Sequence, residues 1–269
     1  MNKRQLTKNS LVKKITFTGS TKIGKLLMKD SSSTVKNISL ELGGNAPFVV
    51  FADADISNAI EGFIAAKFRN AGQTCISANR LFVEEKIFDK FLKKLVVRIK
   101  KLKVGNGFEK SDVGPLISEK AIKKIKNHID DALSKGGEIL IGGKKSKIGK
   151  LFFEPTIVTN INKSMKIFSN ENFGPIIPVI KFKSDEELIQ LANDTNYGLA
   201  AYFYTKKASR VWKIIENLEY GMLGINSGKI SSYLNPFGGL KESGVGREGS
   251  IQCLEPFLET KFVSWSYDD

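Results

Sequence analysis

The pattern of hydrophobic and polar residues along the chain predicts an alternation of strands and helices. Short apolar runs, which are typical of buried strands, occur at 14–18, 35–41, 47–51, 80–83, 138–141, 152–158, 177–182, 199–204 and 222–226. Apolar residues at helical spacing predict helices near 22–29, 56–69, 87–99, 122–133, 185–193 and 206–217. This alternation favours an α/β fold with a largely parallel sheet.

The remaining segments are less regular. Residues 1–13 are polar and are predicted to be irregular, and the glycine-rich stretch 227–249 is predicted to hold little regular structure. The terminal KFVSWSY, 261–267, has the alternation of a strand. There is no internal repeat and no low-complexity linker.

The first strand, the turn GSTKIG and the strand at 35–41 form one predicted βαβ unit. Unpaired backbone N–H groups at a helix N-terminus favour an anion there, and Gly19, Ser20 and Gly24 occupy that turn. A plain strand-to-helix turn is the alternative interpretation. Because one unit cannot make a doubly wound sheet, we expect this sheet to lack earlier strands.

Two residues form a candidate catalytic pair. Cys75 follows Gly72, Gln73 and Thr74 in a loop whose backbone donors could lower the pKa of the thiol, although a lone cysteine is more often a small buried hydrophobic residue. Glu41 ends a buried strand just before two glycines, where desolvation would make its carboxylate a better base. The alternative for Glu41 is a surface position at a strand end.

The single histidine and the second cysteine argue against histidine-dependent triads, a zinc site and a disulfide framework. His128 is the only histidine, and we expect it at a solvated position on a lysine-rich helix, without a role. Without a candidate histidine base there is no Ser/His or Cys/His triad, and no His/Cys cluster offers a zinc site. Cys253 has apolar neighbours and is interpreted as structural, so the two cysteines predict no disulfide framework.

The net charge of +14 is interpreted as solvated helix faces. Only six of the 42 basic residues are arginine, and no aromatic residues interleave with the scattered lysines, so no nucleic-acid partner is expected. No apolar run reaches the length that spans a bilayer. The basic N-terminus has no apolar segment typical of a secretory signal, and the expected location is the cytoplasm.

Five motifs in order resemble the aldehyde dehydrogenase superfamily. They are FTGSTxxG, LELGGNAP, FRNAGQTC, ENFGP and NPFGGLKESGVGREG, beginning at residues 17, 40, 68, 171 and 235. The resemblance extends over about 11–267 and is most similar to the succinate-semialdehyde dehydrogenases. It implies an α/β aldehyde dehydrogenase-like catalytic domain with an incomplete Rossmann-type cofactor domain. The implied parts are a remnant of the dinucleotide-binding domain at 1–41, the catalytic domain at 42–248 and a C-terminal oligomerisation segment at 249–269.

The resemblance also implies a reaction and its residues. Cys75 would attack a small aldehyde, NADP or NAD would take the hydride, and Glu41 would activate the water that hydrolyses the thioester. Gly19, Ser20 and Gly24 match the turn that contacts the pyrophosphate. Residues that match the surroundings of the nicotinamide and its ribose are Leu42, Glu171 and Phe173.

Substrate selection is implied at two further positions. Arg69 and Ser231 match the residues that hold the substrate carboxylate, and an arginine can do so with a bidentate fork. Ser77 replaces a cysteine that some relatives carry, so no redox disulfide is expected. Without the family match, Glu171 would be interpreted as a surface loop residue and Arg69 as a helix-surface residue.

The resemblance leaves two main hypotheses. Relatives carry a long N-terminal portion, with most of the dinucleotide-binding domain, that this sequence does not match. The chain is therefore expected to act as a homo-oligomer or with a complementing N-terminal half chain, and alone it is expected to show no NADP-linked turnover. The alternative is an inactive remnant that keeps the fold and the oligomer surface.

Overall fold

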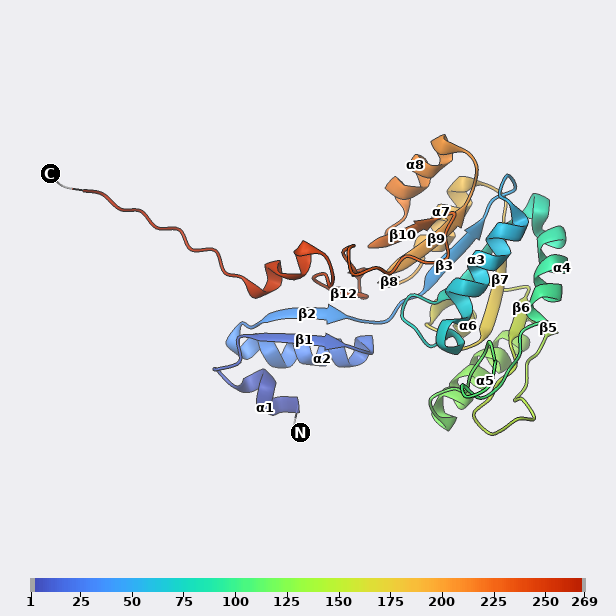
Figure 1. Ribbon diagram of the computed structural model, residues 1–269, viewed down its shortest axis with the longest axis horizontal. Helices are drawn as coiled ribbons and strands as arrows, with labels where there is room; N and C mark the ends of the chain where they lie inside the picture. Colours follow the sequence, from blue (N-terminus) through green and yellow to red (C-terminus); the bar gives the residue numbers. More distant parts are fainter. Residues whose placement is uncertain (1–2, 268–269) are drawn as a thin grey trace.

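The computed structural model describes residues 3–267, and its largest feature is a seven-stranded sheet in the order β10-β9-β3-β4-β7-β6-β5 (Figure 1). All neighbouring strands are parallel except β5 and β6. The strands are β3 (Ala46–Val50), β4 (Ala78–Glu84), β5 (Glu138–Ile141), β6 (Thr156–Thr159), β7 (Ile176–Phe182), β9 (Ala200–Tyr204) and β10 (Met222–Ile225).

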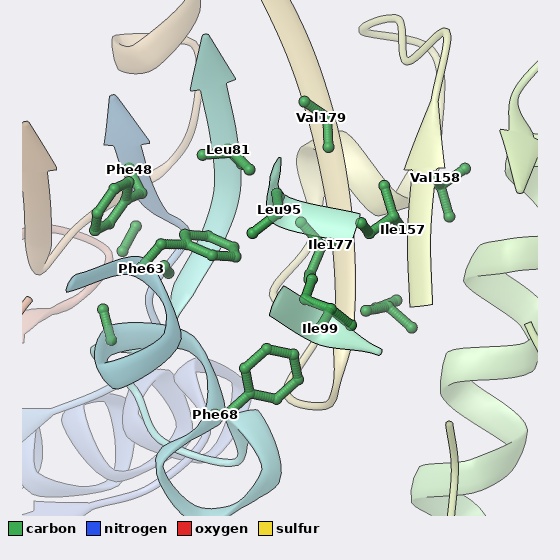
Figure 2. Close-up of a cluster of buried hydrophobic side chains, with 14 of the residues drawn as sticks. Phe48, Phe63, Phe68, Leu81, Leu95, Ile99, Ile157, Val158, Ile177 and Val179 are labelled. Carbon is green, nitrogen blue, oxygen red and sulfur yellow. The ribbon is translucent and has the colours of Figure 1, made fainter. Parts of the chain in front are cut away.

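Helices cover both faces of this sheet, which explains why its central strands are apolar on both sides. On one face Phe48 and Val50 of β3 join a core with α3, α4 and α5. On the other, Val49 joins a core with α6, α7 and α8. Figure 2 shows Phe48, Leu81 and Val179 of the sheet near Phe63 and Leu95 of the helices. The helices are α3 (Ile56–Phe68), α4 (Phe88–Ile99), α5 (Glu119–Ser134), α6 (Lys166–Ser169), α7 (Asp185–Asn193) and α8 (Ala208–Asn217).

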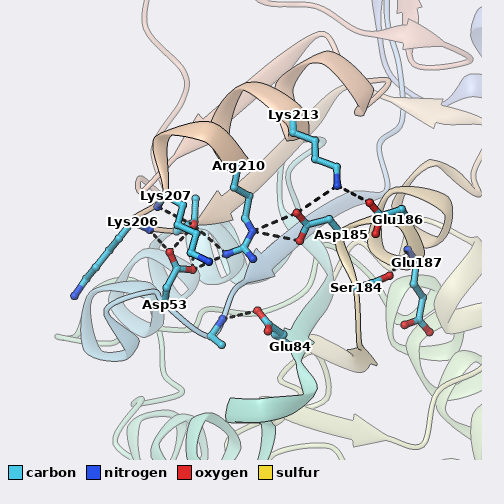
Figure 3. Close-up of polar contacts among 12 residues, drawn as sticks. Asp53, Glu84, Ser184, Asp185, Glu186, Glu187, Lys206, Lys207, Arg210 and Lys213 are labelled. Carbon is cyan, nitrogen blue, oxygen red and sulfur yellow. Dashed lines mark hydrogen bonds and ion pairs between the residues drawn. The ribbon is translucent and has the colours of Figure 1, made fainter.

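A cluster of charged residues fixes α7 and α8 to the turn after β3 (Figure 3). The Arg210 guanidinium of α8 lies 2.9 Å from Asp53 Oδ1 and 3.2 Å from Asp185 Oδ1. Asp53 also accepts a hydrogen bond from the Thr205 hydroxyl. Because these side chains are partly shielded from solvent, the cluster holds the helix ends more firmly than isolated surface pairs do.

A smaller sheet lies beside the large one (Figure 1). β1 (Lys14–Thr18) and β2 (Asn37–Glu41) are parallel and connected by α2 (Thr21–Ser31), so the predicted βαβ unit is present. β12 (Gly244–Val245) pairs antiparallel with β2 and places Gly244 opposite Glu41. A Cβ at Gly244 would lie 1.9 Å from the Leu40 carbonyl oxygen, so only glycine permits this approach. A two-stranded ribbon joins β8 (Tyr197–Gly198) to β11 (Leu240–Lys241).

Three local predictions were wrong. Residues 3–8 form α1 (Lys3–Lys8), which packs against α2 and buries Thr7. The strand predicted at 152–158 is Thr156–Thr159, because the hairpin of 142–155 occupies its first half. Residues 261–267 form no strand and are exposed (Figure 1), since within 3–267 no neighbouring strand pairs with them. No helix within 3–267 combines the length and apolar character needed to cross a membrane.

Candidate active site

A cavity of about 600 Å³ lies between the end of β2 and the loop that precedes β4. Other walls come from α5, the loop before β7 and the loop after β10. It brings together most of the predicted site residues: Gly19, Ser20, Glu41, Leu42, Arg69, Cys75, Glu171, Phe173 and Ser231. Gly24 is not part of the wall. A Cβ there would lie 2.6 Å from the Leu42 side chain, so Gly24 lets α2 pack against a residue that lines the cavity.

The loop that carries Cys75 has an unusual backbone. Asn70, Ala71 and Gly72 have φ of 51°, 56° and 80°, three consecutive residues in the left-handed region. Side chains hold this conformation, because Asn70 Nδ2 donates to the Gln73 carbonyl at 3.1 Å and Gln73 Oε1 accepts from the Ile117 N–H at 2.8 Å. Strain of this kind persists only where surrounding contacts fix it, and it concentrates at functional sites.

The Cys75 thiol is less acidic than expected from the loop alone. Burial raises its pKa to about 11, and the carboxylates of Glu171 and Glu41 raise it as well. The backbone N–H groups of Cys75 and Ile76 lower it, as predicted, but they are outweighed. At neutral pH the resting site therefore holds a protonated thiol beside two carboxyl groups.

Glu41 is buried, with 3% of its surface exposed. The pKa of its carboxyl is raised to about 8, first by burial and then by the charge of Glu248, while Arg247 opposes the shift. Within residues 3–267 its Oε2 is buried and has no hydrogen-bond partner. A carboxyl with a pKa near neutrality has the properties of a general base, and the assignment of that role to Glu41 stays a prediction.

Glu171 also lines the cavity. Its Oε1 accepts a hydrogen bond of 3.1 Å from the Gly44 N–H. Burial raises the pKa of the Glu171 carboxyl, while this bond and the charge of Lys124 lower it. Lys124, on α5, is a cavity residue that the sequence analysis missed. Lys124 is exposed one turn before the buried His128, and no sequence pattern distinguishes it from the other lysines of this helix.

His128 is buried, contrary to the prediction that it is solvated. Only 5% of its surface is exposed, and its Nδ1 lies 2.8 Å from Asn172 Oδ1. Residues 122, 125, 129 and 132 are the buried stripe of α5, and position 128 lies three residues after 125 on the same face. The many lysines of this helix concealed that spacing. Arg247 and Glu248, which act on Glu41, were also not singled out.

Gly44 allows the two halves of the site to meet. A Cβ at this position would lie 2.3 Å from the Cys75 carbonyl oxygen. We expect Gly44→Ala to destabilise the protein by about 1–3 kcal/mol, the usual cost of overpacking, and to lower the Tm by several degrees in a thermal scan. Gly107→Ala is the control, since nothing lies within 4 Å of a Cβ there. Equal Tm values for both variants would contradict the close approach.

Known proteins match almost the whole of this chain. Residues 2–263 match the aldehyde dehydrogenase family. The chain belongs to that family. It is 51% identical to a probable succinate-semialdehyde dehydrogenase [NADP(+)] of Sinorhizobium fredii, over 97% of this chain and 53% of that protein. It is 50% identical to a glutarate-semialdehyde dehydrogenase of Pseudomonas aeruginosa, over 96% of this chain and 54% of that protein.

Solved structures show the same aldehyde dehydrogenase fold. An E. coli NADP-dependent enzyme superimposes with a TM-score of 0.94 at 50% identity, over 96% of this chain and 54% of that one. A betaine aldehyde dehydrogenase of Staphylococcus aureus in complex with NAD+ superimposes with a TM-score of 0.92 at 38% identity, over 96% of this chain and 52% of that one. The predicted superfamily and fold class are thereby confirmed. The chain spans about half the length of the curated relatives it matches.

Proposed function

We propose that this chain carries the nucleophile and the base of an NAD(P)-dependent aldehyde dehydrogenase that acts on a short aldehyde bearing a carboxylate. The observation that carries the proposal is that Cys75 and Glu41 line one cavity, together with Glu171 and the N-terminal turn of α2. Cys75 and Glu41 suit covalent aldehyde chemistry. Glu171 and the N-terminal turn of α2 suit the binding of a dinucleotide.

The residues of the cavity fit the nicotinamide half of such a cofactor. Gly19 and Ser20 line it at the start of α2, where unpaired backbone N–H groups favour phosphate oxygens. The Glu171 carboxylate, held by Gly44, can accept hydrogen bonds from ribose hydroxyls. Leu42 and Phe173 supply apolar surface beside them. When bound, the nicotinamide nucleotide accepts a hydride; whether it is NADP or NAD stays a prediction.

The side chains of the chain would act in two stages. Cys75 Sγ would form a bond to the aldehyde carbon as the thiol proton passes to the carbonyl oxygen, which gives a thiohemiacetal. That carbon would then give up a hydride to the bound nucleotide and its hydroxyl a proton to water, which leaves a thioester on Sγ. Glu41 then takes a proton from water as the water oxygen attacks the thioester carbon. The C–S bond breaks, the carboxylic acid departs and the Cys75 sulfur regains a proton. A Glu41 pKa of about 8 suits it to both accept and release that proton.

The substrate class is supported by two residues and by the names of relatives. Arg69 lies on the cavity wall and donates from Nη1 to the Ser231 hydroxyl at 3.2 Å, so the two predicted carboxylate contacts are adjacent. Similar proteins include dehydrogenases of succinate semialdehyde, glutarate semialdehyde and 3-sulfolactaldehyde, each an anionic aldehyde. We propose succinate semialdehyde, with Arg69 holding its carboxylate.

The test measures how aldehydes protect Cys75 from alkylation by iodoacetamide, read by peptide mass spectrometry. Succinate semialdehyde should protect the wild-type chain. Arg69→Ala should raise the concentration for half-protection about ten- to hundredfold, the loss expected of a hydrogen bond to a charged group, and should leave protection by butanal unchanged. Arg98→Ala, whose guanidinium pairs with Glu61, is the control.

Two outcomes would count against the proposal. If no aldehyde protects Cys75 in the wild type, the thiol is not the nucleophile. If Arg69→Ala weakens protection by butanal and by succinate semialdehyde equally, Arg69 is not the carboxylate contact.

The remaining predictions concern the domain division, the partner chains and the location of the protein. We propose the division into 1–41, 42–248 and 249–269; β1 and β2 lie outside the large sheet, and β12 of the second part pairs with β2. A homo-oligomer, a complementing N-terminal half chain and a cytoplasmic location stay predictions. Within residues 3–267, no group of three or more His, Cys, Asp and Glu side chains is placed to hold a metal ion.

A further inference from the structure

A buried network of amide side chains surrounds the backbone of Glu171. Asn79 of β4 donates from Nδ2 to the Asn170 carbonyl at 3.0 Å and accepts at Oδ1 from the Asn172 N–H at 2.9 Å. One side chain therefore binds both residues that flank Glu171 in the sequence. With 3% of its surface exposed, Asn79 makes these bonds away from competing water.

The same network extends to Asn45, the residue after Gly44, whose N–H donates to Glu171. Asn79 Nδ2 also donates to Asn45 Oδ1, and Asn45 Nδ2 donates to the Phe168 carbonyl at 3.0 Å. Asn45 directly follows Gly44, whose N–H binds the Glu171 carboxylate. The hydrogen bonds thus close a ring that fixes the carboxylate and its backbone donor relative to each other.

Asn172 and His128 are the remaining members of the network. Asn172 Nδ2 donates to the Ile167 carbonyl at 3.2 Å and to the Asn79 carbonyl at 3.4 Å. Since both amide protons point to carbonyl groups, Asn172 Oδ1 is an acceptor, and the neighbouring His128 Nδ1 must carry the proton. These hydrogen bonds anchor the loop that holds Glu171 to α5 as well as to β4.

We propose that Asn79 and Asn172, supported by His128, are positioning residues that hold the Glu171 carboxylate in the cavity. The inference rests on the proposed function of Glu171 in binding a nicotinamide ribose. Glu171 belongs to a loop without regular structure, in which Phe173 has a φ of 55°, so the loop needs outside contacts to keep one conformation. The amide network supplies them.

The first measurement needs no cofactor. The Glu171 carboxyl is titrated by ¹³C NMR in the full chain, its signal assigned by its loss in Glu171→Gln. Its neighbours that titrate or carry charge are Lys124 on α5, Cys75 on the loop and Tyr197 on β8. In the wild type burial keeps the Glu171 pKa raised. In Asn79→Ala, and in the more conservative Asn172→Leu, the freed carboxyl should reach water and its pKa should return toward about 4.3.

The second measurement is the Kd of reduced nicotinamide nucleotide, from its fluorescence. Each variant should raise the Kd about ten- to hundredfold, the loss expected of a hydrogen bond to a charged group. In the Glu171→Gln background the same substitutions should add little, because they act through that carboxylate. If the wild type binds no nucleotide while the Glu171 pKa still falls in the variants, the proposed function fails and the positioning role stands.

Asn193→Ala is the matched control. Asn193 binds the Asn217 carbonyl and the Glu219 N–H, at 2.8 and 3.0 Å, and so repeats the contact pattern of Asn79 around residue 218, outside the cavity wall. It should leave the Glu171 pKa unchanged. An unmoved Glu171 pKa in folded Asn79→Ala or Asn172→Leu, or an equal shift in Asn193→Ala, would overturn the inference. So would an Nε2–H tautomer of His128, whose NMR signals need no assignment because it is the only histidine.

Discussion

Cys75→Ala should abolish turnover of an activated ester such as p-nitrophenyl acetate. The ester acylates the thiol directly and gives the same kind of thioester as aldehyde oxidation, so the assay needs no nicotinamide nucleotide. Removing a catalytic nucleophile costs up to about a millionfold in kcat, and here we expect at least about a ten-thousandfold loss. The measurement is release of p-nitrophenolate by the purified chain.

The chain contains its own control for this substitution. Cys253 is the second cysteine, on a short turn at 251–253, and Cys253→Ala should keep the wild-type rate. Retained turnover in Cys75→Ala would show that another group hydrolyses the ester. Loss of turnover in Cys253→Ala would indicate that Cys253 is the nucleophile, which would contradict the proposed mechanism.

Glu41→Gln should stop the reaction after the first stage. Acylation of Cys75 would release about one p-nitrophenolate per chain, and the thioester would then persist. Without the base, deacylation should slow about 100- to 10,000-fold. The measurement is the decay of acylated Cys75 by mass spectrometry after excess ester is removed.

The pH dependence of that decay follows from the raised pKa of Glu41. Only the ionised carboxylate can accept the proton of water, so the wild-type rate should rise with pH, reach half of its maximum near pH 8 and level off above that value. Well below that value it should fall about tenfold for each pH unit. The slow decay in Glu41→Gln should lack this inflection. Equal decay rates in wild type and variant would remove Glu41 from the mechanism.

Much of the fold follows from local patterns in the sequence. The run APFVV at 46–50 contains no polar side chain, which predicts a strand covered on both faces, and β3 is such a strand. The apolar spacing 122, 125 and 129 predicts α5 in the same way. The segment 261–267 has an equally clear pattern but forms no strand, because a strand also needs a neighbour, and no local pattern supplies one.

The candidate site was only partly predictable for a related reason. Cys75 and Glu41 could be selected from their glycine-bearing surroundings, but the pKa of the thiol depends on which groups meet it in space. Glu171 is 96 positions away in the sequence, and its charge helps to reverse the expected direction of the Cys75 shift. The pairing of Gly244 with Glu41 and the contact of His128 with Asn172 likewise join segments that are far apart in the sequence.

Cys75 and Glu41 line one cavity, close enough for the charge of Glu41 to raise the pKa of the Cys75 thiol. The rate of Cys75 alkylation by iodoacetamide, measured against pH in wild type and Glu41→Gln, tests this directly. Below pH 8 Glu41 is mostly protonated, and the two rates should agree. Above pH 8 the ionised carboxylate holds back the wild-type thiolate, so Glu41→Gln should react severalfold faster. Superimposable curves over the whole range would show that the two groups do not share a site, and would contradict the account.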